Sequence, residues 1–304
     1  MKSSAAKIQM TAFDDLFPGE DAGGAGQILE VPLAELHPFH NHPFHVLDDE
    51  KMQETVDSIA KYGVLVPGIA RPRPAGGYEL VAGHRRKHAS ELAGMTTMPV
   101  IVKELDDDEA IIIMVDTNIQ RENLLPSEKA FAYKMKLEAL KRQGERTDLT
   151  SARDVPKRLT AREQVAQDAG EKSGMAVTRY IALTKLLPKL LDMVDAGKFA
   201  VSTAADYIAD LPQAAQGWLL EVMERLDCTP TTPQLARIKK YQQDEKLDAN
   251  VIDAILTEER PTPMRVTIKG DRLHRYFPKE YTQTQVEEVI FSLLESWRSQ
   301  NTNE

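Results

Sequence analysis

The sequence contains a single cysteine, Cys228, among 304 residues, so no internal disulfide can form and no cysteine-based zinc site can be built. No apolar run approaches the roughly 18 residues that a membrane span needs. The first ten residues also lack the long apolar stretch of a secretory signal. These absences exclude a disulfide scaffold and an integral membrane protein, and they predict a cytoplasmic protein without a membrane partner.

The charge is unevenly distributed along the chain. Lys plus Arg number 38 against 47 Asp plus Glu, which gives a net charge of -9. Between Arg121 and Lys189, however, 15 basic residues face 9 acidic ones, a local balance of +6. This basic middle favours a domain that binds a polyanion, and a solvated helical face is the alternative.

Composition and periodicity divide the chain into four stretches. Residues 1–27 form a glycine-rich, flexible acidic tail. Residues 28–120 alternate helix and strand and predict a small α/β domain, whereas residues 121–228 look all-helical. Residues 229–304 contain polar helices and a candidate strand, Met264–Ile268, which predict a small α/β C-terminal domain. We therefore expect a multidomain α+β protein.

Several local signals place elements inside these stretches. Asp48 or Asp49 can cap a helix that ends at Gly63. The stretches Val64–Ala70 and Tyr78–Ala82 are rich in β-formers and predict strands. The helix after Pro126 contains no breaker up to Gln143, and residues 144–158 are expected to form a loop.

A candidate phosphate site follows the second of these strands, in the sequence Gly83-His84-Arg85-Arg86. A helix start offers unpaired backbone N–H groups and the positive end of the helix dipole. Glycine permits a close backbone approach, and guanidinium groups match phosphate oxygens. The glycine spacing fits neither a Walker A loop nor a dinucleotide fingerprint. Arginines on a solvated first turn are the alternative.

A second polar cluster spans Asn118 to Leu124. Side-chain oxygens near a phosphate site could hold Mg²⁺, which prefers oxygen ligands, and Asn118 is the candidate ligand. Arg121 could neutralise a phosphate. A polar helix end would look the same.

The basic middle contains two short helices, Thr160–Ala169 and Ser173–Leu187, around a tight connection. They predict a helix-turn-helix in which the second helix enters the major groove of DNA. Val177, Tyr180, Ile181 and Thr184 form its expected inner face. The candidate DNA-contacting residues are Arg162, Ser173, Thr178, Arg179 and Lys185.

Two further patterns have competing interpretations. His37, His40, His42 and His45 invite a metal site, but the intervening prolines favour a lead-in loop that could touch a partner. In the last helix, apolar residues recur from Val286 to Trp297, with Thr284 and Glu287 at capping-box spacing. This stripe could pack on its own domain or form a homodimer surface.

The order of these motifs resembles the ParB family of chromosome and plasmid partition proteins, including its nucleoid-occlusion relatives. The passage Tyr78–Ala89 is similar to the family's phosphate motif, usually Gly-Glu-Arg-Arg. The passage Asn118–Ala130 is similar to its Glu-Asn-x-Gln-Arg stretch. The resemblance covers roughly residues 28 to 211.

The resemblance implies a CTP-binding N-terminal domain, a middle domain that reads a palindromic loading site on DNA, and a C-terminal dimerisation domain. CTP with Mg²⁺ would close a dimeric clamp on DNA, and an N-terminal peptide would engage a ParA-like partition ATPase. Gly83, His84, Arg85, Arg86, Asn118 and Arg121 would form the nucleotide site, with Asn118 holding the metal. The protein would be associated with the nucleoid.

The sequence departs from the family pattern at two glutamates, which are His84 and Thr117 here. Two carboxylates are thus missing from a site that handles Mg²⁺ and activates water. We expect CTP hydrolysis to be weak at most. The alternatives are a transcription regulator or a nucleoid-occlusion factor without a nucleotide switch, and a metal-dependent nuclease. A nuclease would need clustered carboxylates such as Asp106 to Glu109, but these acids are more simply the cap of the following helix.

Overall fold

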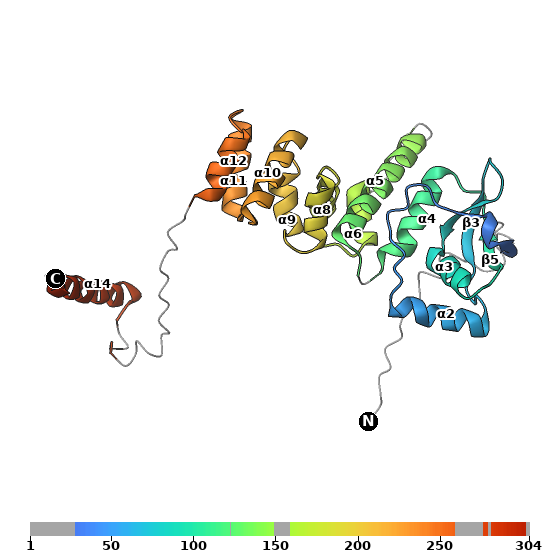
Figure 1. Ribbon diagram of the computed structural model, residues 1–304, viewed down its shortest axis with the longest axis horizontal. Coiled ribbons are helices and arrows are strands. Elements are labelled where there is room, and N and C mark those ends of the chain that lie inside the picture. Colours follow the sequence, from blue (N-terminus) through green and yellow to red (C-terminus); the bar gives the residue numbers. More distant parts are fainter. Residues whose placement is uncertain (1–27, 122, 149–158, 259–275, 279–280, 302–304) are drawn as a thin grey trace, which may run out of the picture. The chain divides into compact units, whose positions relative to one another are not determined.

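The computed structural model describes residues 28–121, 123–148, 159–258, 276–278 and 281–301 (Figure 1). The chain divides into two units, one ending at Thr257 and one beginning at Glu258. The acidic tail and the predicted strand Met264–Ile268 lie outside the described residues. In the described part of the chain, no helix is both long and apolar enough to span a bilayer.

The N-terminal part contains a five-stranded mixed sheet with the order β1-β5-β3-β4-β2. The strands are β1 Ile28–Pro32, β2 Leu36–Pro38, β3 Gly68–Pro72, β4 Tyr78–Ala82 and β5 Thr97–Val102, with a 3₁₀ turn η1 at Leu33–Glu35. The pairs β1–β5 and β3–β4 are antiparallel, whereas β3–β5 and β2–β4 are parallel. This sheet confirms the predicted α+β character of the chain.

One predicted strand begins later than its apolar sequence indicated. The run from Val64 was expected to be extended throughout, but β3 starts only at Gly68. Pro67 has no backbone N–H to donate to a ladder. The carbonyls of Val66 and Pro67 instead accept hydrogen bonds from the Arg86 side chain. The segment before β3 is therefore a loop held by Arg86.

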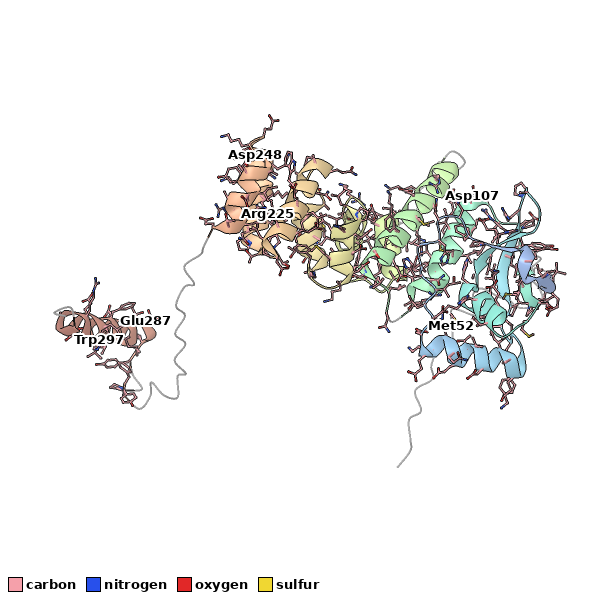
Figure 2. The ribbon with its side chains drawn as sticks, in the orientation of Figure 1. Met52, Asp107, Arg225, Asp248, Glu287 and Trp297 are labelled. Carbon is pink, nitrogen blue, oxygen red and sulfur yellow. The ribbon has the colours of Figure 1, made fainter. Side chains whose placement is uncertain are left out.

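Three helices pack around this sheet, namely α2 Glu50–Tyr62, α3 His84–Leu92 and α4 Asp107–Ile119. Asp49 accepts from the Met52 amide and caps α2, as one of the two expected caps. Met52, labelled in Figure 2, is 2% exposed and packs in the cluster that joins α2 to Ala89 of α3. The apolar stripe of α2 thus docks this helix against α3, the helix of the phosphate motif.

The remaining helices of the first unit follow in sequence. They are α5 Pro126–Asp148, α6 Ala161–Asp168, α7 Gly174–Leu183, α8 Pro188–Asp195, α9 Val201–Thr203, η2 Ala204–Ile208, α10 Gln213–Leu226, α11 Thr232–Gln243 and α12 Ala249–Thr257. Helix α5 continues past Gln143, so the expected loop at 144–158 begins too early. Helix α7 ends at Leu183, four residues before the expected end, because Pro188 opens α8 and the residue before a proline disfavours helical backbone.

The cores do not follow the predicted boundaries between stretches. One cluster combines Val81 of the sheet and Met114 of α4 with Tyr133 of α5, Val165 of α6 and Val177 of α7. The α/β part and the helix-turn-helix therefore share buried side chains across residue 120. A second cluster unites buried residues from α7 through α12, so α11 and α12 pack with the helices that precede residue 228.

The second unit contains the helix α14, Gln283–Asn301. Its start differs from the expected capping box at Thr284. Thr282 accepts from the Gln285 amide at 3.4 Å, and the Gln285 side chain accepts from the Thr282 amide at 2.9 Å. The capping box therefore uses Thr282 and Gln285, two places before the expected Thr284 and Glu287. Glutamine can take the place of glutamate in this box.

Candidate functional site

The phosphate motif sits where β4 passes into α3, as predicted. Gly83 has φ +109°, a conformation that L side chains rarely adopt, and it caps α3. A Cβ at this position would meet Gly68 Cα at 3.2 Å and Arg86 Nη2 at 3.4 Å. Gly83 therefore allows β4, the start of β3 and the first turn of α3 to approach one another closely.

Arg85 and Arg121, which are 36 positions apart in sequence, line one cavity of about 570 Å³. Arg85 donates to Asp49 Oδ1 at 3.0 Å, and Arg121 lies 5.9 Å from the centre of the Phe44 ring. Burial and the positive charge of Arg85 lower the pKa of Arg121. Lys51 and the acids Asp49, Glu54 and Glu128 line the same cavity, so basic and acidic side chains face each other there. Guanidinium groups in such a cavity can still contact an anion.

Arg86 lines a neighbouring cavity of about 330 Å³ formed by α2 and the loop before β3. Its guanidinium donates to the Pro67 carbonyl at 2.8 Å, and burial lowers its pKa. The two cavities share Glu54 and Thr55 of α2. The motif arginines Arg85 and Arg86 therefore line two different cavities that share part of α2.

Sequence reasoning missed the contribution of α2 to these cavities. Lys51, Glu54 and Thr55 line the cavity with Arg85 and Arg121, although they belong to the polar face of an amphipathic helix. In sequence such a face looks the same whether it meets water or a ligand. The packing of α2 against α3, which the periodicity cannot show, distinguishes the two.

The histidine-rich loop lies against the phosphate motif. The His42 and His84 rings have centroids 3.9 Å apart, and His84 Nε2 accepts from the Phe39 amide at 3.4 Å. Glu128 of α5 accepts from the His45 amide at 2.7 Å. The loop thus connects the start of α3 to α5. Among the described residues, no group of three or more metal-ligating side chains is present there.

His84 is neutral in this environment. Burial lowers its pKa to about 3, with smaller contributions in the same direction from the neighbouring His42, Arg121 and Lys87. A neutral imidazole stands here in place of the glutamate of the family motif. The structure therefore replaces a charged acceptor with a neutral one at the start of α3.

Asn118 and Thr117 point into their own helix. Asn118 is 4% exposed, and its amide nitrogen donates to the Met114 carbonyl at 2.7 Å. The Thr117 hydroxyl donates to the Ile113 carbonyl at 2.9 Å. Neither lines the cavity that contains Arg121. This geometry does not bring the predicted metal ligand Asn118 to the arginines.

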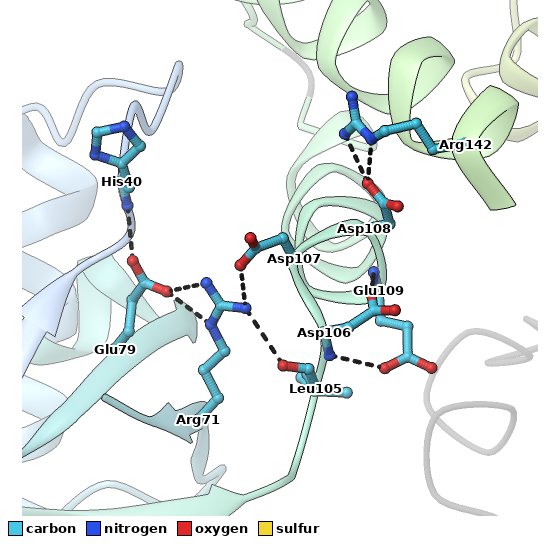
Figure 3. Close-up of polar contacts among 9 residues, drawn as sticks. All are labelled: His40, Arg71, Glu79, Leu105, Asp106, Asp107, Asp108, Glu109 and Arg142. Carbon is cyan, nitrogen blue, oxygen red and sulfur yellow. Dashed lines mark hydrogen bonds and ion pairs between the residues drawn. The ribbon is translucent and has the colours of Figure 1, made fainter. Parts of the chain in front are cut away.

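The acids at the start of α4 are engaged in structural contacts (Figure 3). Asp106 and Glu109 form the capping box that opens the helix. Asp107 and Glu79 both pair with Arg71 at 2.7 Å, and Asp108 pairs with Arg142 at 2.6 Å. Of the four acids proposed for a nuclease, Asp107 and Asp108 are therefore paired with arginines, and Asp106 and Glu109 cap the helix.

The helix-turn-helix consists of α6 and α7. Thr160 and Glu163 form a capping box at α6, and Val165 and Val177 are fully buried between the helices. The candidate DNA-contacting residues Arg162, Ser173, Thr178, Arg179 and Lys185 are all exposed. Ala182 of α7 packs against the core of the following helices.

Comparisons with known proteins decide the family. The model of the ParB N-terminal domain matches residues 19–119. The chromosome-partitioning protein Spo0J of Thermus thermophilus is 33% identical over 202 residues, which are 66% of this chain and 67% of that protein. The chain belongs to the ParB family. The resemblance inferred from the Gly83 and Asn118 motifs is thereby confirmed.

Two solved structures of the C-terminally truncated ParB from Caulobacter crescentus are also similar to this ParB-family chain. The one complexed to the centromeric parS site is 24% identical, with 75% of this chain and 97% of that chain covered and a TM-score of 0.41. The one complexed with CTP-gamma-S is 29% identical, with 61% and 93% covered and a TM-score of 0.30.

Proposed function

We propose that this chain is a partition protein that binds CTP beside α3 and double-stranded DNA through α6 and α7. The observation that carries the nucleotide site is the convergence of Arg85 and Arg121 in one cavity at the start of a helix. Guanidinium groups and a helix N-terminus together suit a polyphosphate. The choice of cytidine follows from the ParB assignment, and Mg²⁺ would enter with the phosphates.

Arg121 provides the sharpest test of the nucleotide site. Arg121→Ala removes one cation from the cavity and should weaken CTP binding about tenfold or more, because hydrogen bonds to charged groups contribute about 1.5–3 kcal/mol. Isothermal titration calorimetry of the full chain with CTP and Mg²⁺ measures this. Arg73→Ala is the matched control, since Arg73 follows β3 and lines neither cavity. Equal CTP affinity in both variants contradicts the assignment.

Weak hydrolysis remains part of the proposal. A neutral imidazole at His84 and a hydroxyl bonded to its own helix at Thr117 supply no carboxylate for activating water. CTP should therefore bind and turn over slowly, with or without DNA. Rapid phosphate release in the presence of DNA would show that other side chains activate the water.

The DNA contacts are proposed for Arg162, Ser173, Thr178, Arg179 and Lys185. All five are exposed, and they lie on α6, on α7 and just beyond the two ends of α7, which supports this role. Phosphate contacts release counterions, so duplex affinity should fall steeply as salt rises. Fluorescence anisotropy with a labelled duplex measures the slope. A salt-independent affinity would contradict the interface.

Self-association through α14 completes the proposal. Leu293, Leu294 and Trp297 are 63%, 53% and 64% exposed, and such a stripe is suited to a second copy of the chain. A dimer closed by CTP could then slide from its loading site, with a ParA-like ATPase as partner. Genome-wide mapping of occupied DNA tests this. Broad shoulders around a narrow peak indicate spreading, whereas isolated peaks indicate a plain transcription regulator.

A further inference from the structure

Two carboxylates approach the exposed side of α7 from the turn that follows α9. Arg179 donates from Nε to Asp206 Oδ1 at 3.1 Å and from Nη2 to Oδ2 at 3.0 Å. Asp206 belongs to the turn η2, in which the Ala209 amide bonds to the Ala204 carbonyl five residues earlier. Such π-turns are rare and often occur at functional sites.

The second carboxylate, Asp210, extends this contact to α11. Lys239 of α11 lies 3.0 Å from Asp210 and donates to the main-chain carbonyl of Asp206 at 2.6 Å. Lys185, just after α7, lies 3.8 Å from the same carboxylate. Three cations from two parts of the chain thus meet two acids beside the proposed recognition helix.

Stability does not explain the Arg179–Asp206 pair. The two side chains are 43% and 42% exposed, and ion pairs this accessible contribute little to folding. Acids on a surface that binds DNA also repel phosphates, so they reduce affinity. The position of the Arg179–Asp206 pair on this surface therefore has an explanation other than stability or DNA affinity.

Orientation of the guanidinium supplies that explanation. The pair uses Nε and one N–H of Nη2, which leaves three of the five guanidinium N–H groups of Arg179 for a ligand. Guanine presents two acceptors that a guanidinium can contact together. An arginine already held in one orientation loses less rotamer freedom on making such a contact.

We propose that Asp206 is a positioning residue that fixes Arg179 for a base contact and disfavours binding to random DNA. The proposal rests on the proposed function of α6 and α7 in binding DNA. It assigns base selectivity to an acid outside the helix-turn-helix. Asp210 reinforces the arrangement by holding Lys185 and Lys239 near the same surface.

The test uses the full chain and a pool of 30-base-pair duplexes with a randomised centre. Bound duplexes are selected and sequenced for wild type, Asp206→Ala, Asp206→Asn and Arg179→Ala. Binding to the wild-type consensus and to a scrambled duplex is then measured by fluorescence anisotropy at one salt concentration. Asp192→Ala is the matched control, because Asp192 is an exposed acid of α8 without contact to Arg179.

We expect Asp206→Ala to lose base preference at one position per half-site by at least about fivefold, the range for one bidentate base contact. Binding of the scrambled duplex should tighten, and Asp206→Asn should lie between because it keeps one acceptor. Arg179→Ala should lose preference at the same position, and a double variant that combines Asp206→Ala with Arg179→Ala should show no further loss.

The other possible outcomes contradict the positioning role of Asp206 or the proposed DNA function. Unchanged base preference in Asp206→Ala, or loss at a position that Arg179→Ala does not affect, overturns the positioning role. A loss of preference in Asp192→Ala equal to that in Asp206→Ala shows a general charge effect and also overturns it. If wild type selects no motif from the pool, the proposed DNA function itself fails.

Discussion

His84→Gln tests whether the residue that replaces the family glutamate is buried and neutral. In the structure, burial, with smaller contributions from His42, Arg121 and Lys87, lowers the pKa of His84 to about 3 from the ordinary value of 6.5. At pH 5, His84 therefore binds a proton in the unfolded chain but not in the folded chain. A group with a lowered histidine pKa destabilises the fold as the pH falls below 6.5.

The magnitude follows from these two pKa values. Between pH 7 and pH 5, a histidine with an unfolded pKa of 6.5 and a folded pKa of about 3 costs about 2 kcal/mol of stability. Gln cannot be protonated in this range, and its side-chain oxygen can still accept from the Phe39 amide. His84→Gln should thus remove about 2 kcal/mol from the pH dependence, while His42, whose pKa burial also lowers, keeps a smaller part.

Urea denaturation followed by circular dichroism, at pH 7 and at pH 5, measures the difference. At pH 7 the variant should lie within about 1 kcal/mol of wild type, because His84 is neutral in both states there. His40→Gln serves as the control, since the His40 side chain is exposed. The same pH slope in wild type and in His84→Gln would refute the buried, neutral histidine.

Two further predictions concern the supports of the site. Lys136 is 1% exposed and pairs with Asp116 and with Asp168. Lys136→Ala should therefore destabilise the fold by about 2–3 kcal/mol. The loss is smaller than for a fully buried ion pair because both aspartates are partly exposed. Lys136→Met, which keeps the volume, should cost less in the same urea titration. Gly83→Ala should destabilise the fold by at least about 1–2 kcal/mol because of the left-handed backbone alone, and the new contact with Gly68 should add to this cost. The variant should also bind CTP more weakly. An unchanged Tm would contradict the close approach of β3 and α3 at Gly83.

The sequence predicted best the features that neighbouring residues determine. Asp49 and Asp106 cap helices where the pattern placed caps, because a capping side chain and its amide lie within three residues. The turn at Gly83 followed from a strand signal and a helix signal on either side. These contacts are local, so their sequence signature is complete.

The cavity walls required long-range information. Glu54 and Thr55 reach the motif arginines only because α2 packs on α3, and the His42 ring reaches His84 across 42 positions. Nothing in the spacing of the histidines distinguishes a metal site from a loop that packs on α3. The sheet order also places β1 and β2 at opposite edges, although they are neighbours in sequence. Because β2 lies next to β4, the histidine-rich loop after β2 lies beside the phosphate motif that follows β4.

Lys136 shows what the periodicity of α5 alone could have predicted. It lies one turn after Ala132 and one turn before Leu140, on the apolar side of α5 that buries Tyr133 and Leu137. A lysine in such a stripe needs a partner, because an unpaired buried ammonium is strongly unfavourable. Its partners, Asp116 of α4 and Asp168 of α6, belong to helices on either side of residue 120. The buried charge therefore required the α/β part and the helix-turn-helix to pack together, which the division of the chain by composition could not indicate.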